Sequence, residues 1–262
     1  MALPHDNSRG VSFDRIADTY DETRGSDWRV STTATALARW LLRDAPVVEV
    51  GVGTGLIAGR LRTDGWPVVG FDLSPRMLRE ATRRLGAAVG VGDAQQLPVR
   101  DASVGSVYFV HVLHLVADVT ATLREAVRVL RPGGRLLAVC APDDGPRNET
   151  AQLMARLRER LSGPREDTPE RVVATAEAAG CTLIGRETLT GSSLISPEAI
   201  AARLEQRIWS WTWDVPEDVW AAEAEPVIAR LRAMPDPDEP RQRSRERSLL
   251  VLSAPGRPVA RT

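Results

Sequence analysis

The sequence predicts an α/β fold in which helices cover both faces of a parallel sheet. Three observations predict it. Short apolar runs alternate with helical patterns between residues 46 and 140, and a glycine-rich turn joins the first run to a helix. The 262 residues are 43% apolar and 26% charged, which is ordinary globular usage and excludes a wholly disordered chain.

Two helices are expected in the first 45 residues, because apolar side chains recur there every three or four positions. From residue 46 onward, runs rich in valine and leucine mark strands, and the segments between them have helical periodicity. The helices are expected at 11–22, 26–42, up to about 63, 74–85 and 118–130, and the strands at 46–50, 67–71, 87–91, 104–110 and 135–140, the last after a turn at 131–134.

The pattern changes after residue 140. Helices are expected at about 148–161, 169–179, 196–210 and 216–233, and strands at 181–189 and 245–253. We therefore expect an N-terminal helical lid (1–45) and one sheet domain (46–262), with helical insertions at about 143–180 and 190–235.

The strongest local signal is the glycine-rich segment VVEVGVGTG. An apolar strand leads into Gly51, Gly53 and Gly55, where a ligand can approach the main chain closely. The dinucleotide fingerprint places its third glycine where this chain has Leu56, and the acidic Glu49 suits a cationic ligand better than a pyrophosphate. A tight turn without a ligand is the alternative.

Acidic residues also follow the next two strands. Asp72 ends the second strand, where a carboxylate can accept hydrogen bonds from both hydroxyls of a ribose. Asp93 follows the third strand, where it can accept from an exocyclic amine. Either acid alone could be a helix cap or a loop residue, but three successive strands with acids near their ends predict a ligand site.

These residues resemble those of a known family. The segments VVEVGVGTG, VVGFDLSPRMLREA, VGDAQQLPV and LREAVRVLRPGGRLLAV resemble the class I S-adenosylmethionine-dependent methyltransferases, and most of all their quinone-type and natural-product branch. The resemblance covers about residues 11–140. It implies a Rossmann-like mixed sheet of seven strands in the order 3-2-1-4-5-7-6, with the last strand antiparallel, and a helical cap.

The resemblance also implies a cofactor site for S-adenosyl-L-methionine. The three glycines would pack against its methionyl part, Glu49 would help to hold its amino group, and Asp72 would bind the ribose. Asp93 would accept from the adenine amine. The other implied contacts come from Tyr20 in the lid, Leu73 and Met77 near the adenine, Ala94, and Val110 and His111 at the end of the fourth strand.

Two histidines are candidates for a general base. His111 and His114 follow the fourth strand, where the acceptor side of this family opens, although both could be structural. A base is needed only where the nucleophile carries a proton that must leave. With no lysine in the chain, a lysine base is excluded. No metal site is expected.

Three tryptophans alternate in the segment IWSWTW. If the segment is extended, Trp209, Trp211 and Trp213 share one side and could bind an apolar or aromatic substrate. The alternative is a helical cap that packs on the core.

The sequence therefore predicts an enzyme that transfers a methyl group from S-adenosylmethionine to a small molecule, at O or N rather than C. A cofactor-binding homologue without activity and an NAD-dependent oxidoreductase are the alternatives. The net charge of −1 argues against a nucleic-acid partner. We expect a cytoplasmic protein, monomeric or homodimeric, because the start of the chain does not resemble a signal peptide and no apolar run is long enough to span a membrane.

Overall fold

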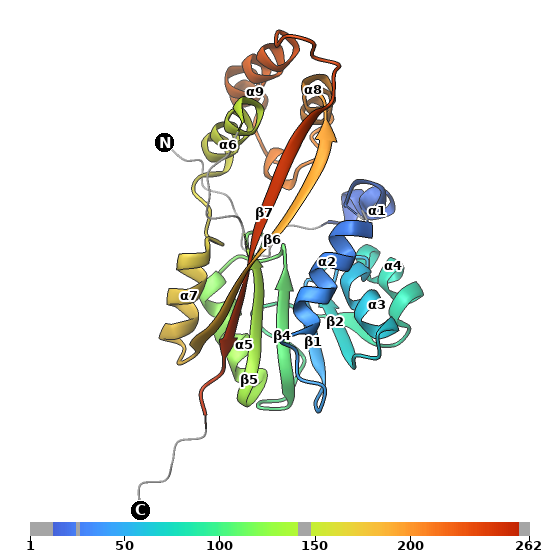
Figure 1. The fold of residues 1–262 in the computed structure, drawn as a ribbon, viewed down its shortest axis with the longest axis vertical. Coiled ribbons are helices and arrows are strands. Elements are labelled where there is room, and N and C mark those ends of the chain that lie inside the picture. The colour runs from blue at the N-terminus through green and yellow to red at the C-terminus, as the bar shows by residue number, and fades with distance from the viewer. Residues whose placement is uncertain (1–12, 25–26, 141–147, 257–262) are drawn as a thin grey trace, which may run out of the picture. The chain divides into compact units, whose positions relative to one another are not determined.

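The computed structural model describes residues 13–24, 27–140 and 148–256, which form two compact units (Figure 1). The larger unit comprises the described parts of Asn7–Ala141, Glu166–Leu189 and Arg247–Thr262. The smaller unit comprises those of Pro142–Arg165 and Thr190–Glu246. The boundary between the units falls within two long strands, β6 and β7.

Within the described residues, the sheet has seven strands in the order β3-β2-β1-β4-β5-β7-β6. β1 pairs in parallel with β2 and β4, β2 with β3, and β4 with β5, whereas β5 and β7 are antiparallel. The predicted strand order is confirmed, and so is the antiparallel seventh strand. The strands are β1 (Val47–Val50), β2 (Val68–Asp72), β3 (Val89–Val91), β4 (Val104–Val110), β5 (Leu130–Cys140), β6 (Thr182–Ile195) and β7 (Arg241–Ser253).

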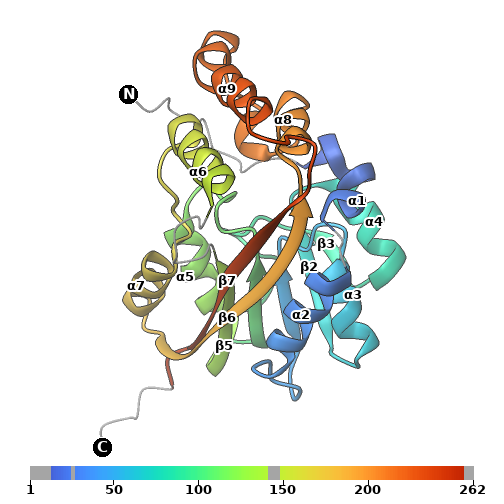
Figure 2. The ribbon, with the colours of Figure 1, turned by 45° about the horizontal axis from the view of Figure 1, so that its top comes forward.

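Helices cover both faces of the sheet, as predicted. Alternate residues of β1 enter different cores: Val47 packs with residues of α2, α3 and α4, and Val48 packs with residues of α5 and α7. Figure 2 shows α5 and α7 on the opposite side of the sheet from α2 and α3. The helices are α2 (Asp27–Ala38), α3 (Leu56–Thr63), α4 (Pro75–Leu85), α5 (Val119–Val129) and α7 (Pro169–Ala178).

Several element boundaries differ from the predicted ones. The first predicted helix is a 3-10 helix, η1 (Asp14–Thr19), followed by the short α1 (Tyr20–Arg24). The strand predicted at 181–189 extends to Ile195, and the strand predicted at 245–253 begins at Arg241. Pairing between strands extends these elements beyond their apolar runs, and sequence periodicity does not record such pairing.

The predicted insertion at about 143–180 is divided between the two units. α7 belongs to the larger unit because its Val172 and Ala176 are buried in the same core as α5. The predicted lid consists of two parts that pack differently. α2 packs against α3 as part of the larger unit, and η1 and α1 form a separate short segment ahead of it.

The smaller unit contains α6 (Glu149–Ser162), α8 (Pro197–Glu205), η2 (Ser210–Thr212) and α9 (Glu217–Arg232) around its own core. The helix predicted at 196–210 ends early, because Arg207 has a left-handed backbone with φ of 48°. In the part of the chain that the structure describes, no helix is long and apolar enough to cross a membrane.

Candidate functional site

The glycine loop between β1 and α3 has the geometry that the sequence predicts for a ligand site. A side chain at Gly51 would overlap Val112, so only glycine allows the loop to lie against the segment after β4. Gly53 has φ of 55°, and a Cβ there would meet no atom within 4 Å. Because Gly53 faces open space rather than packed atoms, a ligand can approach its backbone.

Asp72 joins the glycine loop to the turn after β2. Its carboxylate accepts hydrogen bonds from the backbone N–H groups of Gly53 and Ser74, each at 2.8 Å. Burial raises the pKa of Asp72, and the hydrogen bonds from Ser74 and Gly53 oppose that shift. A carboxylate offers about four acceptor positions, so two protein bonds leave room for two ribose hydroxyls.

The two apolar residues predicted near the adenine differ in exposure. Leu73 is 43% exposed, which is unusual for a leucine beside a buried strand, and it offers an apolar surface to a ligand. Met77 is 1% exposed and lies inside the core, where α4 packs on the sheet. The Met77 side chain therefore offers little surface to a ligand, and its place near the adenine stays a prediction.

Asp93 lies in a tight turn after β3. Its side chain accepts from the N–H of Gln95 at 2.8 Å, and its backbone pairs with Gln96. Ala94 is buried beneath the turn. The Asp93 carboxylate is half-buried and keeps acceptor positions for a further donor.

Glu49 is a deeply buried acid at the end of β1. It is 3% exposed and accepts a 2.9 Å hydrogen bond from the hydroxyl of Tyr108. Burial raises the pKa of Glu49 to about 8, although the Tyr108 hydroxyl favours the charged form. Tyr108 was missed in the sequence, where it is a phenol within an otherwise apolar strand; such a hydroxyl needs a buried partner.

The N-terminal segment is fastened to the same loops. Asp21 accepts from the hydroxyl of Thr54 in the glycine loop and from Arg84 of α4, both at 2.6 Å. Asp14 accepts from the hydroxyl of Ser74. Tyr20 precedes Asp21 and meets the ring of Phe13 edge-on at 6.1 Å. The predicted lid residue Tyr20 therefore lies on a segment whose next residue contacts the glycine loop.

The end of β4 brings both candidate histidines to this edge of the sheet. Val110 ends the strand, and His111 follows with a left-handed backbone at φ of 57°. His114 lies in the next turn, and its Nδ1 is 3.5 Å from a carboxylate oxygen of Asp167. Asp167 precedes α7, far away in the sequence, and no local motif marks it as a site residue.

The three tryptophans of the smaller unit are not arranged as an extended segment would place them. Trp209 and Trp211 stack with centroids 5.8 Å apart, on either side of the start of the 3-10 helix η2. Trp213 is buried, and its indole N–H donates to the Arg207 carbonyl at 2.8 Å. The extended backbone on which the shared side depended is absent, because the segment forms a helical turn, and a substrate-binding role of these tryptophans stays a prediction.

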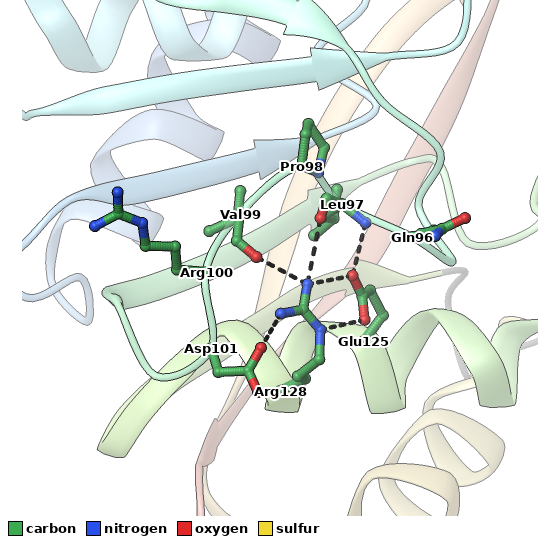
Figure 3. Close-up of a pocket in the computed structure, with 8 residues that line it drawn as sticks. All are labelled: Gln96, Leu97, Pro98, Val99, Arg100, Asp101, Glu125 and Arg128. Atoms are coloured by element: carbon green, nitrogen blue, oxygen red, sulfur yellow. Dashed lines mark hydrogen bonds and ion pairs between the residues drawn. The ribbon is translucent and has the colours of Figure 1, made fainter.

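A pocket lined by residues 96–101 and by Glu125 and Arg128 of α5 contains none of the predicted site residues (Figure 3). Its polar groups are largely engaged with one another. Arg128 donates to the carbonyls of Leu97 and Val99 at 3.2 and 2.9 Å, and Glu125 accepts from the N–H of Leu97 at 2.6 Å. We interpret Glu125 and Arg128 as a clamp that holds the loop at residues 96–101, which continues from Asp93.

In the described residues, no group of three or more His, Cys, Asp or Glu side chains could hold a metal ion.

Comparisons with known proteins agree with this geometry. The family described as "Methyltransferase domain" matches residues 48–138. The demethylmenaquinone methyltransferase of Beutenbergia cavernae is 39% identical over 142 residues, which cover 51% of this chain and 57% of that protein. An uncharacterized methyltransferase of Mycobacterium bovis is 30% identical over 176 residues, which cover 66% of this chain and 69% of that protein. The chain belongs to the class I S-adenosylmethionine-dependent methyltransferases.

Solved structures support the same fold. A methyltransferase in complex with the Haloferax volcanii Trm112 activator has a TM-score of 0.60 at 22% identity, covering 94% of this chain and 98% of that one. Haemonchus contortus phosphoethanolamine N-methyltransferase 2 has a TM-score of 0.54 at 18% identity, covering 94% of this chain and 58% of that one. The chain matches little more than half the length of the demethylmenaquinone methyltransferases.

The residues at the family's cofactor position fit S-adenosylmethionine. The space over Gly53 is open, Asp72 and Asp93 have acceptor positions left for hydroxyl and amine donors, and Leu73 gives an exposed apolar surface. The buried carboxyl of Glu49 suits a cationic amino group, because a nearby positive charge favours the charged carboxylate that burial otherwise penalises.

Replacing Arg128 by leucine is expected to lower the free energy of unfolding by about 2–3 kcal/mol, since it removes the donor of two carbonyls and leaves Glu125 with the N–H of Leu97 alone. Because the clamped loop continues from Asp93, we also expect weaker binding of S-adenosylhomocysteine, by less than tenfold. Urea denaturation and calorimetry measure the two effects. Arg131→Leu is the control, because Arg131 pairs with the exposed Asp44 and such surface pairs contribute little. Equal losses of stability in the two variants would contradict the clamp.

Proposed function

We propose that the chain transfers a methyl group from S-adenosylmethionine to an oxygen or nitrogen atom of a small molecule. The observation that carries the proposal is the convergence of the glycine loop, Asp72 and the Asp93 turn at the carboxyl ends of β1, β2 and β3, in a member of this family. Two relatives indicate acceptor classes: the Beutenbergia demethylmenaquinone methyltransferase, and a malonyl-[acyl-carrier protein] O-methyltransferase of Hahella chejuensis that is 34% identical over 134 residues.

S-adenosylmethionine, when bound, supplies a methyl group on a sulfonium, so the protein contributes position and the exclusion of water. Asp72 would accept hydrogen bonds from the ribose hydroxyls, and Asp93 would accept one from the adenine amine. Glu49 would pair as a carboxylate with the cationic amino group. His111 and His114 lie just past β4 and are the candidates to take a proton from the acceptor.

Calorimetric titration with S-adenosylmethionine, S-adenosylhomocysteine and NADH tests the cofactor. The two sulfur compounds should bind and NADH should not; no binding of either sulfur compound would overturn the proposal. Turnover is then tested by mass spectrometry on a panel of soluble hydroquinones, phenols and carboxylic acids. Binding without turnover on the whole panel would favour a cofactor-binding homologue without activity.

Trp209 and Trp211 are the proposed acceptor-binding pair, because their stacked rings are only partly buried and offer a flat apolar surface. We expect a bound aromatic acceptor to quench tryptophan fluorescence, and we expect Trp211→Phe to lose most of that quenching. Trp213→Phe is the matched control, because the Trp213 ring is buried. Equal quenching in wild type and Trp211→Phe would assign the pair to core packing instead.

The predictions about nucleic acid, cellular location and oligomeric state remain proposals. A net charge of −1 supports a small-molecule acceptor over a nucleic acid. The cytoplasmic location and the monomeric or homodimeric state are further proposals.

A further inference from the structure

His114 and Asp167 form a pair that joins two distant parts of the larger unit. His114 lies in a turn closed by a 2.8 Å hydrogen bond from the N–H of Leu115 to the carbonyl of Val112. Asp167 lies just before α7, whose N-cap is Thr168. The Nδ1 atom of His114 and the Oδ2 atom of Asp167 are 3.5 Å apart.

The two side chains differ in burial in the way that a base and its orienting acid require. The Asp167 side chain is 3% exposed, and that of His114 is 33% exposed. The carboxylate therefore lies behind the imidazole, which keeps an accessible edge. Of the two tautomers of the neutral ring, a carboxylate acceptor at Nδ1 favours the one with its proton on Nδ1, in which the lone pair of Nε2 can take a proton.

The turn that carries His114 lies against the proposed cofactor loop. Val112, two residues before His114, fills the space over Gly51 so closely that no other residue fits there. His114 thus belongs to the segment that contacts the glycine loop on the side where β4 ends. Asp167 comes from a different segment, the one that leads into α7.

We propose that Asp167 positions His114 as the general base of the methyl transfer, a role that rests on the proposed function. The acceptor's O–H or N–H bond breaks and its proton moves to Nε2 of His114. The freed electron pair of the acceptor forms the new bond to the methyl carbon. The pair of the breaking S–C bond stays on sulfur, which loses its positive charge. His114 then releases the proton to water, so atoms and charge balance. Asp167 is a positioning residue and touches no reacting atom.

The tautomer of His114 tests the pair without any acceptor. The chain has three histidines, so ¹⁵N NMR of histidine-labelled protein gives few signals, and His114→Gln assigns the one in question. At a pH where the ring is neutral, we expect the Nδ1–H form in wild type and a shift toward the Nε2–H form in Asp167→Ala. An Nε2–H ring in wild type, or an unchanged ring in Asp167→Ala, would overturn the proposal.

Turnover tests whether the pair acts in catalysis. We expect kcat to fall at least tenfold in Asp167→Ala and more in His114→Gln, with the Kd of S-adenosylhomocysteine unchanged. The starting acceptor is 1,4-dihydroxynaphthalene, replaced by the best acceptor of the panel where that one is faster. The double variant should be no slower than His114→Gln, because the two residues act as one unit. Asp167→Asn retains side-chain volume and guards against loss of folding.

Glu170→Gln is the control. Glu170 is an exposed carboxylate in the first turn of α7, paired with Arg186 at 3.3 Å, and its loss should alter neither the tautomer nor kcat. If wild type transfers methyl groups and Asp167→Ala does so equally fast, the positioning role is wrong while the proposed function stands. If wild type transfers none on the whole panel, the proposed function fails and the base role with it, whereas the tautomer still reports whether Asp167 orients the ring.

Discussion

Replacing Asp72 by asparagine is expected to weaken the binding of S-adenosylhomocysteine by about 100-fold, or about 2.8 kcal/mol. The carboxylate bonds the N–H groups of Gly53 and Ser74 through different oxygens. An asparagine has a single acceptor oxygen, so its NH₂ must face one of these two donors. The variant thus loses charged acceptors for the ribose, each worth about 1.5–3 kcal/mol, and also disturbs the glycine loop.

Calorimetry with S-adenosylhomocysteine measures this loss without turnover. Asp64→Asn is the matched control. Asp64 is an exposed acid of the same unit; it follows α3 and pairs with Arg60 of that helix. The control should bind like wild type. Should Asp72→Asn keep its affinity within threefold while the protein stays folded, Asp72 would be a structural tie between two loops rather than a ribose ligand.

The architecture was predictable because local signals and pairing agree along the first 140 residues. All four residues of β1 are buried and three of them are valines, because a central parallel strand is covered on both faces of the sheet; Glu49 is the exception. The glycine spacing likewise specified the loop, since a side chain at Gly51 would overlap Val112. At these positions the backbone conformation or full burial permits few residue types, so the sequence alone indicates the structure.

The partners of the site residues could not be predicted in the same way. Tyr108 and Asp167 act through contacts that join strands or segments far apart in the chain, and neither belongs to a local motif. In the tryptophan segment, by contrast, a local pattern is present but predicts the wrong arrangement. Its period of two predicts one shared side only for an extended backbone, and the left-handed Arg207 and the turn at η2 remove that premise. Local pattern predicts an element, whereas the side chain's direction depends on how the element ends.

Glu49 gives the second large effect, on stability as a function of pH. Burial raises the pKa of Glu49 from 4.5 to about 8, so the folded chain holds this proton at pH values where the unfolded chain has released it. The free energy of unfolding therefore falls as pH rises through this window, by about 5 kcal/mol from Glu49 alone. In Glu49→Gln that contribution is absent, because the amide does not ionise and its oxygen can still accept from Tyr108.

Urea denaturation at pH 5 and pH 9 measures the difference between the two proteins. Relative to wild type, Glu49→Gln should become more stable by several kcal/mol as pH rises to 9; a difference independent of pH would contradict the buried, protonated carboxyl.

The affinity for S-adenosylhomocysteine should change in the opposite direction to the stability. The amide cannot pair with the cationic amino group of S-adenosylhomocysteine, so Glu49→Gln should bind it more weakly at pH 9 despite folding more stably. A carboxyl kept for packing would gain stability and lose no affinity, so opposite signs in the two measurements identify Glu49 as a residue whose buried charge serves the ligand at a cost to the fold.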